Sequence, residues 1–307
     1  MIRRALFPLL ACFLLSVPSS VRAKDQFFDS SGVRIHYIVE GQGEPVVLIH
    51  GFTADIDKNW RTGFSAGPQN YRQGPRIIEA LSRNYRVIAL DNRGHGKSDK
   101  PHDTKQYGLE MVEDIVRLLD HLKIKKAHVV GYSMGAVITA RLLVMHPDRL
   151  LSATLGGHGG IRDASRNQFY DELADSLEQG KGFGPLIVAL TPAGRPKPTP
   201  EQIAAINAGL SKSNDPKALA AAVRGFRELA VEPEKLKTNR VPALALIGEL
   251  DPLKKGVDAL QRDMANLKVV VIPGADHVTA VSSPEFIKTL SEFLARHRSA
   301  ESLKKAG

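Results

Sequence analysis

The stretch of sequence that decides the fold is Val129-Val130-Gly131-Tyr132-Ser133-Met134-Gly135-Ala136. An apolar strand over residues 127–130 leads into the pattern Gly-x-Ser-x-Gly, and residues 134–145 are apolar almost all round, which predicts a buried helix. Glycines at the flanking positions let neighbouring backbone pass close to the turn without a clashing Cβ. The pattern therefore predicts a sharp strand-to-helix turn with Ser133 at its apex.

Strand and helix patterns alternate on both sides of this turn. Apolar or alternating runs predict strands at residues 33–39, 45–49, 85–90, 127–130, 152–155, 243–248 and 268–272. The stretches between several of them have helical patterns, and this alternation is typical of a mostly parallel sheet with helices on both faces. We therefore expect an α/β fold.

Residues 161–240 interrupt this alternation. Helical patterns there surround a proline-rich connector over residues 191–200, and no convincing strand pattern is present. We therefore predict an α/β core formed by residues 24–160 and 241–297, with residues 161–240 as a helical insertion between two strands of the sheet. Residues 298–307 are predicted to form a polar tail.

The first residues have the pattern of a secretory signal peptide. A basic start, a short apolar run and small residues before Ala23 predict cleavage after residue 23. We expect a secreted or periplasmic protein without a stable membrane span after cleavage, and retention of the segment as an anchor stays open. The only cysteine, Cys12, lies inside this segment, so the mature chain would form no disulfide. The apolar region before Cys12 is too short to favour a lipoprotein.

Composition narrows the classes of function. The chain has 307 residues, of which 43% are hydrophobic, an ordinary content for a globular core. The formal net charge of +9 is spread along the chain without blocks of like charge, so no nucleic-acid partner is predicted. The sequence does not indicate an oligomeric state.

Three polar residues follow three of the predicted strands. Ser133 follows the strand at residues 127–130, Asp251 lies three residues after Gly248, and His277 lies just beyond the last strand. The carboxyl ends of parallel strands meet at one edge of a sheet, so we expect these side chains to lie close together. A serine hydroxyl is a poor nucleophile at neutral pH and needs a base, which in turn needs an orienting group. We predict Ser133 as nucleophile, His277 as general base and then acid, and Asp251 as the group that fixes the imidazole.

Some assignments stay open at this stage. Glu249 is the alternative to Asp251, which we prefer because of its position against Pro252 in the loop. His158 lies in a run of glycines and is either a pocket residue or a residue of a flexible loop. Trp60, the only tryptophan, is either a pocket residue or part of the core.

Acyl transfer also needs hydrogen-bond donors for the oxyanion that forms on the substrate. The usual donors are the backbone N–H after the nucleophile and an N–H from a neighbouring strand-to-helix loop. These positions correspond to the backbone N–H groups of Met134 and Phe52. For His50 and His95 we predict roles in shaping turns.

Five motifs resemble those of the α/β-hydrolase superfamily, in particular its single-domain enzymes with a helical cap. They are His50-Gly51-Phe52, Asp91-x-Arg93-Gly94-His95-Gly96-x-Ser98, Gly131-Tyr132-Ser133-Met134-Gly135, Gly248-Glu249-Leu250-Asp251 and Asp276-His277. The resemblance covers nearly the whole mature chain. It implies a mostly parallel, eight-stranded sheet, a cap formed by residues 161–240, and a pocket between cap and core. It implies neither a metal nor a cofactor.

The chain departs from the family pattern in two respects. The loop after His50-Gly51 is longer than usual, which leaves the identity of the second oxyanion donor less certain, and the lipase-type His-Gly-Gly-Gly pattern is missing. Haloalkane dehalogenases and epoxide hydrolases have a similar pattern but use aspartate as nucleophile, so the serine argues against both.

These observations predict a serine hydrolase that cleaves a small or medium carboxylic ester through an acyl-enzyme. A lactone or a thioester is an open alternative as substrate. A cofactor-free perhydrolase with the same triad is the alternative activity. A slow-turnover ligand-binding or sensor protein on the same fold is the alternative outside enzymes, because a fold alone does not establish a function.

Overall fold

The computed structural model describes residues 23–62, 76–161, 163, 166–192 and 194–300. Outside this described part lie residues 1–22 of the predicted signal peptide, residues 63–75 of the long loop, and residues 301–307 of the predicted polar tail. Among the described helices, none is long and apolar enough to cross a membrane.

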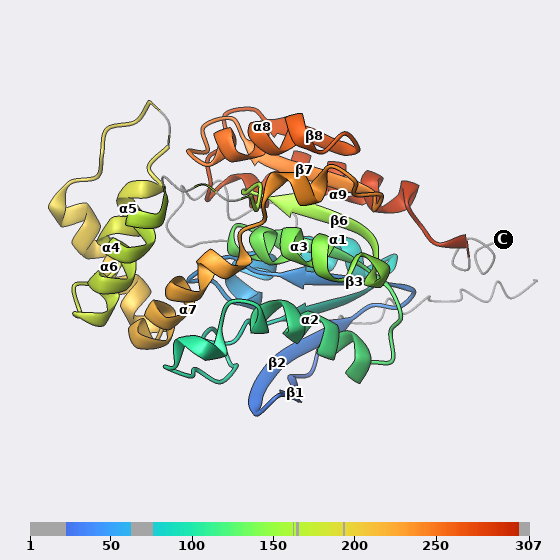
Figure 1. The fold of residues 1–307 in the computed structure, drawn as a ribbon, viewed down its shortest axis with the longest axis horizontal. Helices are drawn as coiled ribbons and strands as arrows, with labels where there is room; N and C mark the ends of the chain where they lie inside the picture. The colour runs from blue at the N-terminus through green and yellow to red at the C-terminus, as the bar shows by residue number, and fades with distance from the viewer. Residues whose placement is uncertain (1–22, 63–75, 162, 164–165, 193, 301–307) are drawn as a thin grey trace, which may run out of the picture.

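The sheet has eight strands in the order β1-β2-β4-β3-β5-β6-β7-β8 (Figure 1). Their bounds are β1 Gln26–Ser30, β2 Val33–Glu40, β3 Glu44–Ile49, β4 Tyr85–Leu90, β5 Ala127–Tyr132, β6 Leu150–Gly156, β7 Ala243–Gly248 and β8 Leu267–Ile272. β2 pairs antiparallel with both β1 and β4, whereas every pair from β4 across to β8 is parallel. This topology confirms the predicted fold class.

β1 is the strand that the sequence pattern did not locate. It has only five residues, and it lies at the edge of the sheet, where it pairs with β2 alone. Its buried side chains are those of Phe28 and Ser30. A short edge strand with one buried apolar residue carries too little periodicity to be recognised from sequence.

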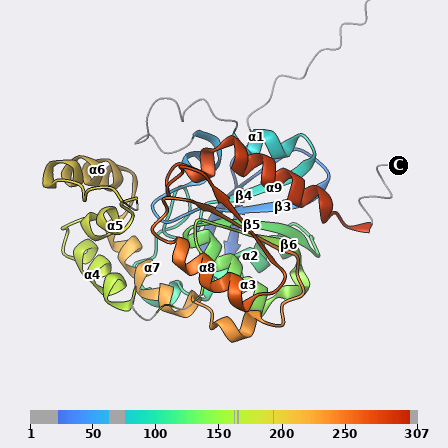
Figure 2. The same cartoon turned by 90° about the horizontal axis from the view of Figure 1, so that it is seen from above.

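Helices cover both faces of the sheet (Figure 2). Their bounds are α1 Ile77–Ser82, α2 Glu110–His121, α3 Met134–Met145, α8 Lys254–Asp263 and α9 Pro284–Arg296. α2, α3 and α8 contribute to one apolar cluster, and α1 and α9 contribute to the other. Alternate residues of β3 enter the two clusters, Val47 and Ile49 the first and Val46 and Leu48 the second, as expected for a strand buried on both faces.

Short helical turns complete the described secondary structure. They are the π-helical turn η1 (Asp57–Thr62) and the 3₁₀ turns η3 (Thr104–Gln106), η4 (Pro147–Arg149), η6 (Pro233–Leu236) and η7 (Ala280–Ser282). Of these, η1 bears on the site because it follows β3 and packs close to α1.

Four helices lie between β6 and β7 in the chain, and we call them the helical segment. They are α4 Asn167–Glu178, α5 Gly184–Ala189, α6 Pro200–Ser213 and α7 Pro216–Leu229. Figures 1 and 2 show α4, α5 and α6 together at one side of the sheet. Leu173 and Leu177 of α4 pack with Leu219 and Val223 of α7 in a small apolar cluster of their own.

The helical segment is also joined to the core. Arg141 of α3 donates from Nε to the carbonyl of Leu229 over 3.1 Å and from Nη2 to the carbonyl of Ala230 over 2.6 Å. Phe52, in the loop after β3, packs edge-on against Phe226 of α7 with the ring centroids 5.4 Å apart. The exact boundaries predicted for core and cap stay predictions.

Candidate active site

Ser133 occupies the turn between β5 and α3. Its backbone has φ 54° and ψ −113°, a conformation that few residues other than glycine adopt. A Cβ on Gly131 would lie 2.0 Å from the carbonyl oxygen of Gly135, and a Cβ on Gly135 would lie 2.0 Å from that of Ile49. The Ser133 N–H donates to the carbonyl of Gly156 over 2.7 Å. The turn is therefore wedged against two neighbouring strands, β3 and β6, and its glycines are required.

His277 lies between Ser133 and Asp251. Its Nε2 is 2.9 Å from Ser133 Oγ, and its Nδ1 is 2.8 Å from Asp251 Oδ2. His277 and Asp251 are 5% and 2% exposed. A carboxylate only accepts hydrogen bonds, so Asp251 places the ring proton on Nδ1 and leaves Nε2 to accept from the Ser133 hydroxyl. The structure thus brings the three predicted residues into one chain of hydrogen bonds, while their catalytic roles stay predictions.

Neighbouring groups fix this chain of hydrogen bonds. Asp251 Oδ1 accepts from the Leu253 N–H over 2.8 Å, and the Tyr132 hydroxyl donates to the His277 carbonyl over 2.7 Å. Burial raises the pKa of the Tyr132 phenol well above its usual value, so this donor stays protonated. Glu249, the alternative acid, accepts from the Gly274 N–H over 2.8 Å through Oε2 and does not join the chain of hydrogen bonds.

The backbone N–H groups of Phe52 and Met134 are available to an oxyanion. Met134 is the first residue of α3, where an N–H has no partner within the helix, and the Phe52 N–H has no acceptor in the described part of the chain. A Cβ on Gly51 would lie 3.2 Å from Ser133 Cβ, so the loop after β3 lies directly against the serine. Asn59 Oδ1 accepts the Gly51 N–H over 2.8 Å and holds this loop in place.

His50 and His95 lie in buried turns beside the serine loop. His50 Nε2 accepts the Asn92 N–H over 2.9 Å, and its Nδ1 donates to the Gly51 carbonyl over 2.7 Å. The rings of His50 and His95 meet edge-on with their centroids 5.1 Å apart. Burial lowers the pKa of both rings, that of His95 to about 3, so both are neutral at physiological pH. Neither ring lines the cavity that contains Ser133.

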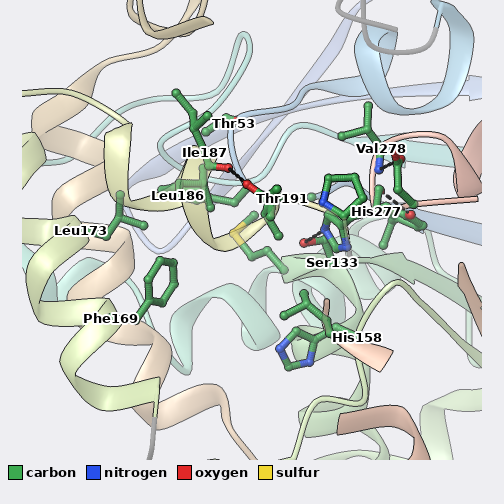
Figure 3. Close-up of a pocket in the computed structure, with 18 of the residues that line it drawn as sticks. Thr53, Ser133, His158, Phe169, Leu173, Leu186, Ile187, Thr191, His277 and Val278 are labelled. Atoms are coloured by element: carbon green, nitrogen blue, oxygen red, sulfur yellow. Dashed lines mark hydrogen bonds between the residues drawn. The ribbon is translucent and has the colours of Figure 1, made fainter. Parts of the chain in front are cut away.

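A cavity of about 490 Å³ adjoins Ser133 and is closed on its other side by the helical segment. Figure 3 shows Ser133 and His277 on one side of it and Phe169 and Leu173 of α4 on the other. Most of its lining is apolar. In the part of the chain that the structure describes, no group of three or more histidine, cysteine or acidic side chains could hold a metal ion.

The structure separates the two candidate pocket residues. His158 lines the cavity and lies close to Ser133 in Figure 3. Trp60 is only 1% exposed and packs with Ile56, Ile77 and Ile78 in the apolar cluster on the α1 and α9 face. Of the two positions considered for Trp60, the structure therefore has the core position, because η1 directs this ring into the core.

Arg166 is one of the cavity residues that sequence reasoning missed. Arg166 lines the cavity directly before α4, and its Nε is buried without a hydrogen-bond partner in the structure. Its guanidinium lies 5.2 Å from the ring centroid of Phe169 and 6.0 Å from that of Tyr170. Nothing in the local sequence distinguishes Arg166 from the other arginines of the insertion, since its direction depends on how α4 docks.

Comparisons with known proteins agree with the fold and the order of the motifs. The family model for the alpha/beta hydrolase fold matches residues 44–180. A 2-hydroxy-6-oxo-6-(2'-aminophenyl)hexa-2,4-dienoic acid hydrolase of Metapseudomonas resinovorans is 27% identical over 292 residues, which cover 89% of this chain and 91% of that protein.

Two further similarities cover different shares of the chain. The dihydrolipoyllysine-residue acetyltransferase component of the acetoin cleaving system of Cupriavidus necator is 36% identical over 166 residues, or 54% of this chain but only 40% of that protein. The solved structure of an N-acyl homoserine lactone degrading enzyme superposes with a TM-score of 0.64 at 26% identity, covering 87% of this chain and 100% of that one. The family model, the relatives and the strand order therefore agree on an α/β-hydrolase fold for this chain, with sequence similarity to members of that superfamily.

Proposed function

We propose that this protein is a serine hydrolase that cleaves a small or medium carboxylic ester, a lactone included, through an acyl-enzyme. The observation that carries the proposal is the continuous contact from Ser133 Oγ to His277 Nε2, at 2.9 Å, and from His277 Nδ1 to Asp251 Oδ2, at 2.8 Å. This contact lies at the wall of a cavity of about 490 Å³, within the size range of small-molecule sites.

The proposed mechanism uses the geometry of these three residues. Ser133 Oγ attacks the ester carbonyl carbon while its proton passes to His277 Nε2, and Asp251 stabilises the resulting imidazolium. The N–H groups of Phe52 and Met134 donate to the oxyanion of the tetrahedral intermediate. Collapse of this intermediate breaks the bond to the leaving alcohol, which takes the proton from His277. Water, deprotonated by His277, then attacks the acyl-enzyme and releases the acid.

The similar proteins support the class of substrate in general terms. One relative over nearly the whole chain is a hydrolase of a substituted hexadienoic acid, and a similar solved structure degrades N-acyl homoserine lactones. The two substrate names contain an oxo group and a lactone respectively, and both groups include a carbonyl carbon. The apolar lining of the cavity favours a substrate with an aliphatic or aromatic acyl portion.

The first test is covalent labelling of the nucleophile. A fluorophosphonate probe is expected to label the purified protein at Ser133, and His277→Ala is expected to slow labelling strongly because the base is lost. A panel of p-nitrophenyl esters of increasing chain length, together with lactones, then gives the preferred acyl group. Absence of labelling at Ser133, or undiminished labelling of His277→Ala, would count against the proposal.

The alternatives are separated by related measurements. A perhydrolase would form peracid from acetate and hydrogen peroxide, so the same protein is assayed for peracid. A slow-turnover binding protein would be labelled by the probe yet hydrolyse no member of the ester panel. Secretion or periplasmic location, which we also propose from residues 1–23, is tested by following the protein in culture medium and cell fractions.

A further inference from the structure

The cavity beside Ser133 contains a cation that has no counter-ion among the described residues. Arg166 lines the cavity, and its buried Nε has no hydrogen-bond partner. Phe169 and Tyr170, which line the same cavity, lie 5.2 and 6.0 Å from the guanidinium as measured to their ring centroids. Aromatic rings at these distances attract a cation and orient it, but they do not neutralise its charge. A buried donor without an acceptor is uncommon in native structures, so this Nε–H is a candidate contact for an acceptor atom of a ligand.

In the described part of the chain, no carboxylate is paired with this guanidinium. The acidic residues of α4 face two arginines of α7, in the pairs Arg227–Asp171, Arg224–Asp175 and Arg224–Glu178. Asp163 offers its main-chain carbonyl to the Arg166 N–H over 3.1 Å. Within the described residues, no acidic side chain forms an ion pair with Arg166. Its charge therefore remains available to a molecule in the cavity.

A second donor lies near Arg166. His158 Nδ1 accepts the Gly160 N–H over 2.8 Å, so the ring proton is on Nε2. Burial first, and then the positive charge of Arg166, lower the pKa of His158 to about 3, so the ring is neutral. Its Nε2–H has no partner in the described part of the chain. His158 thus adds a neutral donor beside a charged one.

One carboxylate oxygen of Asp276, a residue that also lines the cavity, accepts three hydrogen bonds from the turn after β8. Its Oδ1 accepts from the backbone N–H of Val278 over 2.9 Å and from that of Thr279 over 2.8 Å. The Thr279 hydroxyl donates to the same oxygen over 2.8 Å. Asp276 therefore fixes the turn after β8 and does not serve as the partner of Arg166.

We propose that Arg166 and His158 form a subsite for an anionic group, and that the ester or lactone cleaved at Ser133 carries a carboxylate. The inference rests on the proposed function and deepens it by naming a class of substrate. A carboxylate has acceptors for a charged guanidinium and for a neutral N–H at the same time. The apolar lining between this subsite and Ser133 accommodates the carbon chain that joins the two ends of such a substrate.

Calorimetry with the Ser133→Ala protein tests the subsite without turnover. The ligands are monomethyl adipate and the methyl ester of adipamic acid, which match in size and differ in charge. We expect the charged ester to bind on the order of 10- to 100-fold more tightly, since one hydrogen-bonded charge pair is gained. In the Ser133→Ala protein, the further change Arg166→Gln is expected to remove this difference in affinity. Arg166→Lys in the same background is expected to retain part of it. Adding Arg227→Gln, a matched change outside the cavity, leaves the difference intact.

Two results would overturn the subsite: equal binding of both ligands, or a preference for charge that survives Arg166→Gln. Hydrolysis assays distinguish failure of the proposed subsite from failure of the proposed function. If the protein with Ser133 intact hydrolyses neutral esters but binding shows no preference for charge, the function stands and the subsite falls. If no ester is hydrolysed while the preference depends on Arg166, the function falls and the subsite stands. A cooperative thermal unfolding transition of Arg166→Gln, at a temperature near that of the unsubstituted protein, shows that this variant is folded.

Discussion

At the scale of single residues, Asp251 and Glu249 were the two candidates for the acid that contacts His277. Asp251 Oδ2 lies 2.8 Å from His277 Nδ1, and its second oxygen accepts the Leu253 N–H. Glu249 instead accepts the Gly274 N–H. Both acids lie in the same short loop after β7, so the sequence alone could not distinguish them. The path of the loop backbone directs only Asp251 towards His277.

Replacing these two acids is expected to have very different effects. Asp251→Asn would lower kcat on the order of 10⁴-fold, because an amide favours the wrong tautomer of His277. Glu249→Gln would leave kcat near its original value, since its carboxylate holds only the turn at Gly274. Steady-state kinetics on the preferred p-nitrophenyl ester measure both variants. A loss on Glu249→Gln as large as that on Asp251→Asn would refute the assignment.

Tyr132 contacts His277 through both its hydroxyl and its ring. Its hydroxyl donates to the His277 carbonyl over 2.7 Å, and its ring lies 5.6 Å from the imidazole between centroids. Tyr132→Phe is expected to lower stability by about 1–3 kcal/mol, since a buried carbonyl loses its donor, and to reduce kcat more than KM. Urea unfolding and kinetics of the same preparation give both numbers, with Tyr170→Phe as the matched control. Unchanged stability would show that water replaces the hydroxyl.

Side-chain direction explains which site residues the sequence could and could not indicate. Ser133, Asp251 and His277 follow strand ends, and a parallel sheet brings strand ends together whatever the details of packing. Trp60 lies in the short turn η1 before α1, and Arg166 directly precedes α4, so the direction of each side chain depends on how the following helix docks. Their side chains point into the core and into the cavity respectively, and no periodicity predicts either.

The turn between β5 and α3 is the element on which the site depends. A Cβ added to Gly135 would lie 2.0 Å from the carbonyl oxygen of Ile49. This neighbour is backbone and cannot move aside as a flexible side chain can. The strands and helix that flank this turn were predictable because their apolar runs are long and unbroken. β1 was not, because its only buried apolar side chain is Phe28.

A pair of glycine substitutions tests this view of the turn. Gly135→Ala is expected to destabilise the protein by about 3 kcal/mol or more and to reduce activity, since β3 must shift away from α3. Gly209→Ala, in the exposed helix α6 with open space around the position, is expected to be neutral or to stabilise by up to about 1 kcal/mol. Thermal unfolding measures both. Equal stability of the two variants would contradict the close approach at Gly135.

Buried histidines distributed through the whole molecule affect its stability as a function of pH. Burial lowers the pKa of His50, His95 and His128, that of His95 to about 3. These groups bind a proton more readily in the unfolded chain, whose histidine pKa is about 6.5. Their contribution to stability is therefore complete above about pH 6.5 and is lost as the pH falls. His36 differs, because hydrogen bonds that its ring donates to Asp91 and Asp25 outweigh burial and raise its pKa. Its contribution to stability therefore has the opposite sign and is lost at rising pH.

The free energy of unfolding is accordingly expected to decrease as the pH is lowered from about 6.5 towards 4, with His95 alone contributing about 1.4 kcal/mol per pH unit. His95 is fully buried between His50 and Phe52, so the folded protein cannot accept its proton without opening this region. Urea unfolding at several pH values measures the slope. His95→Gln should flatten it. A slope that is the same in both proteins would mean that burial of His95 does not lower its pKa in the folded state.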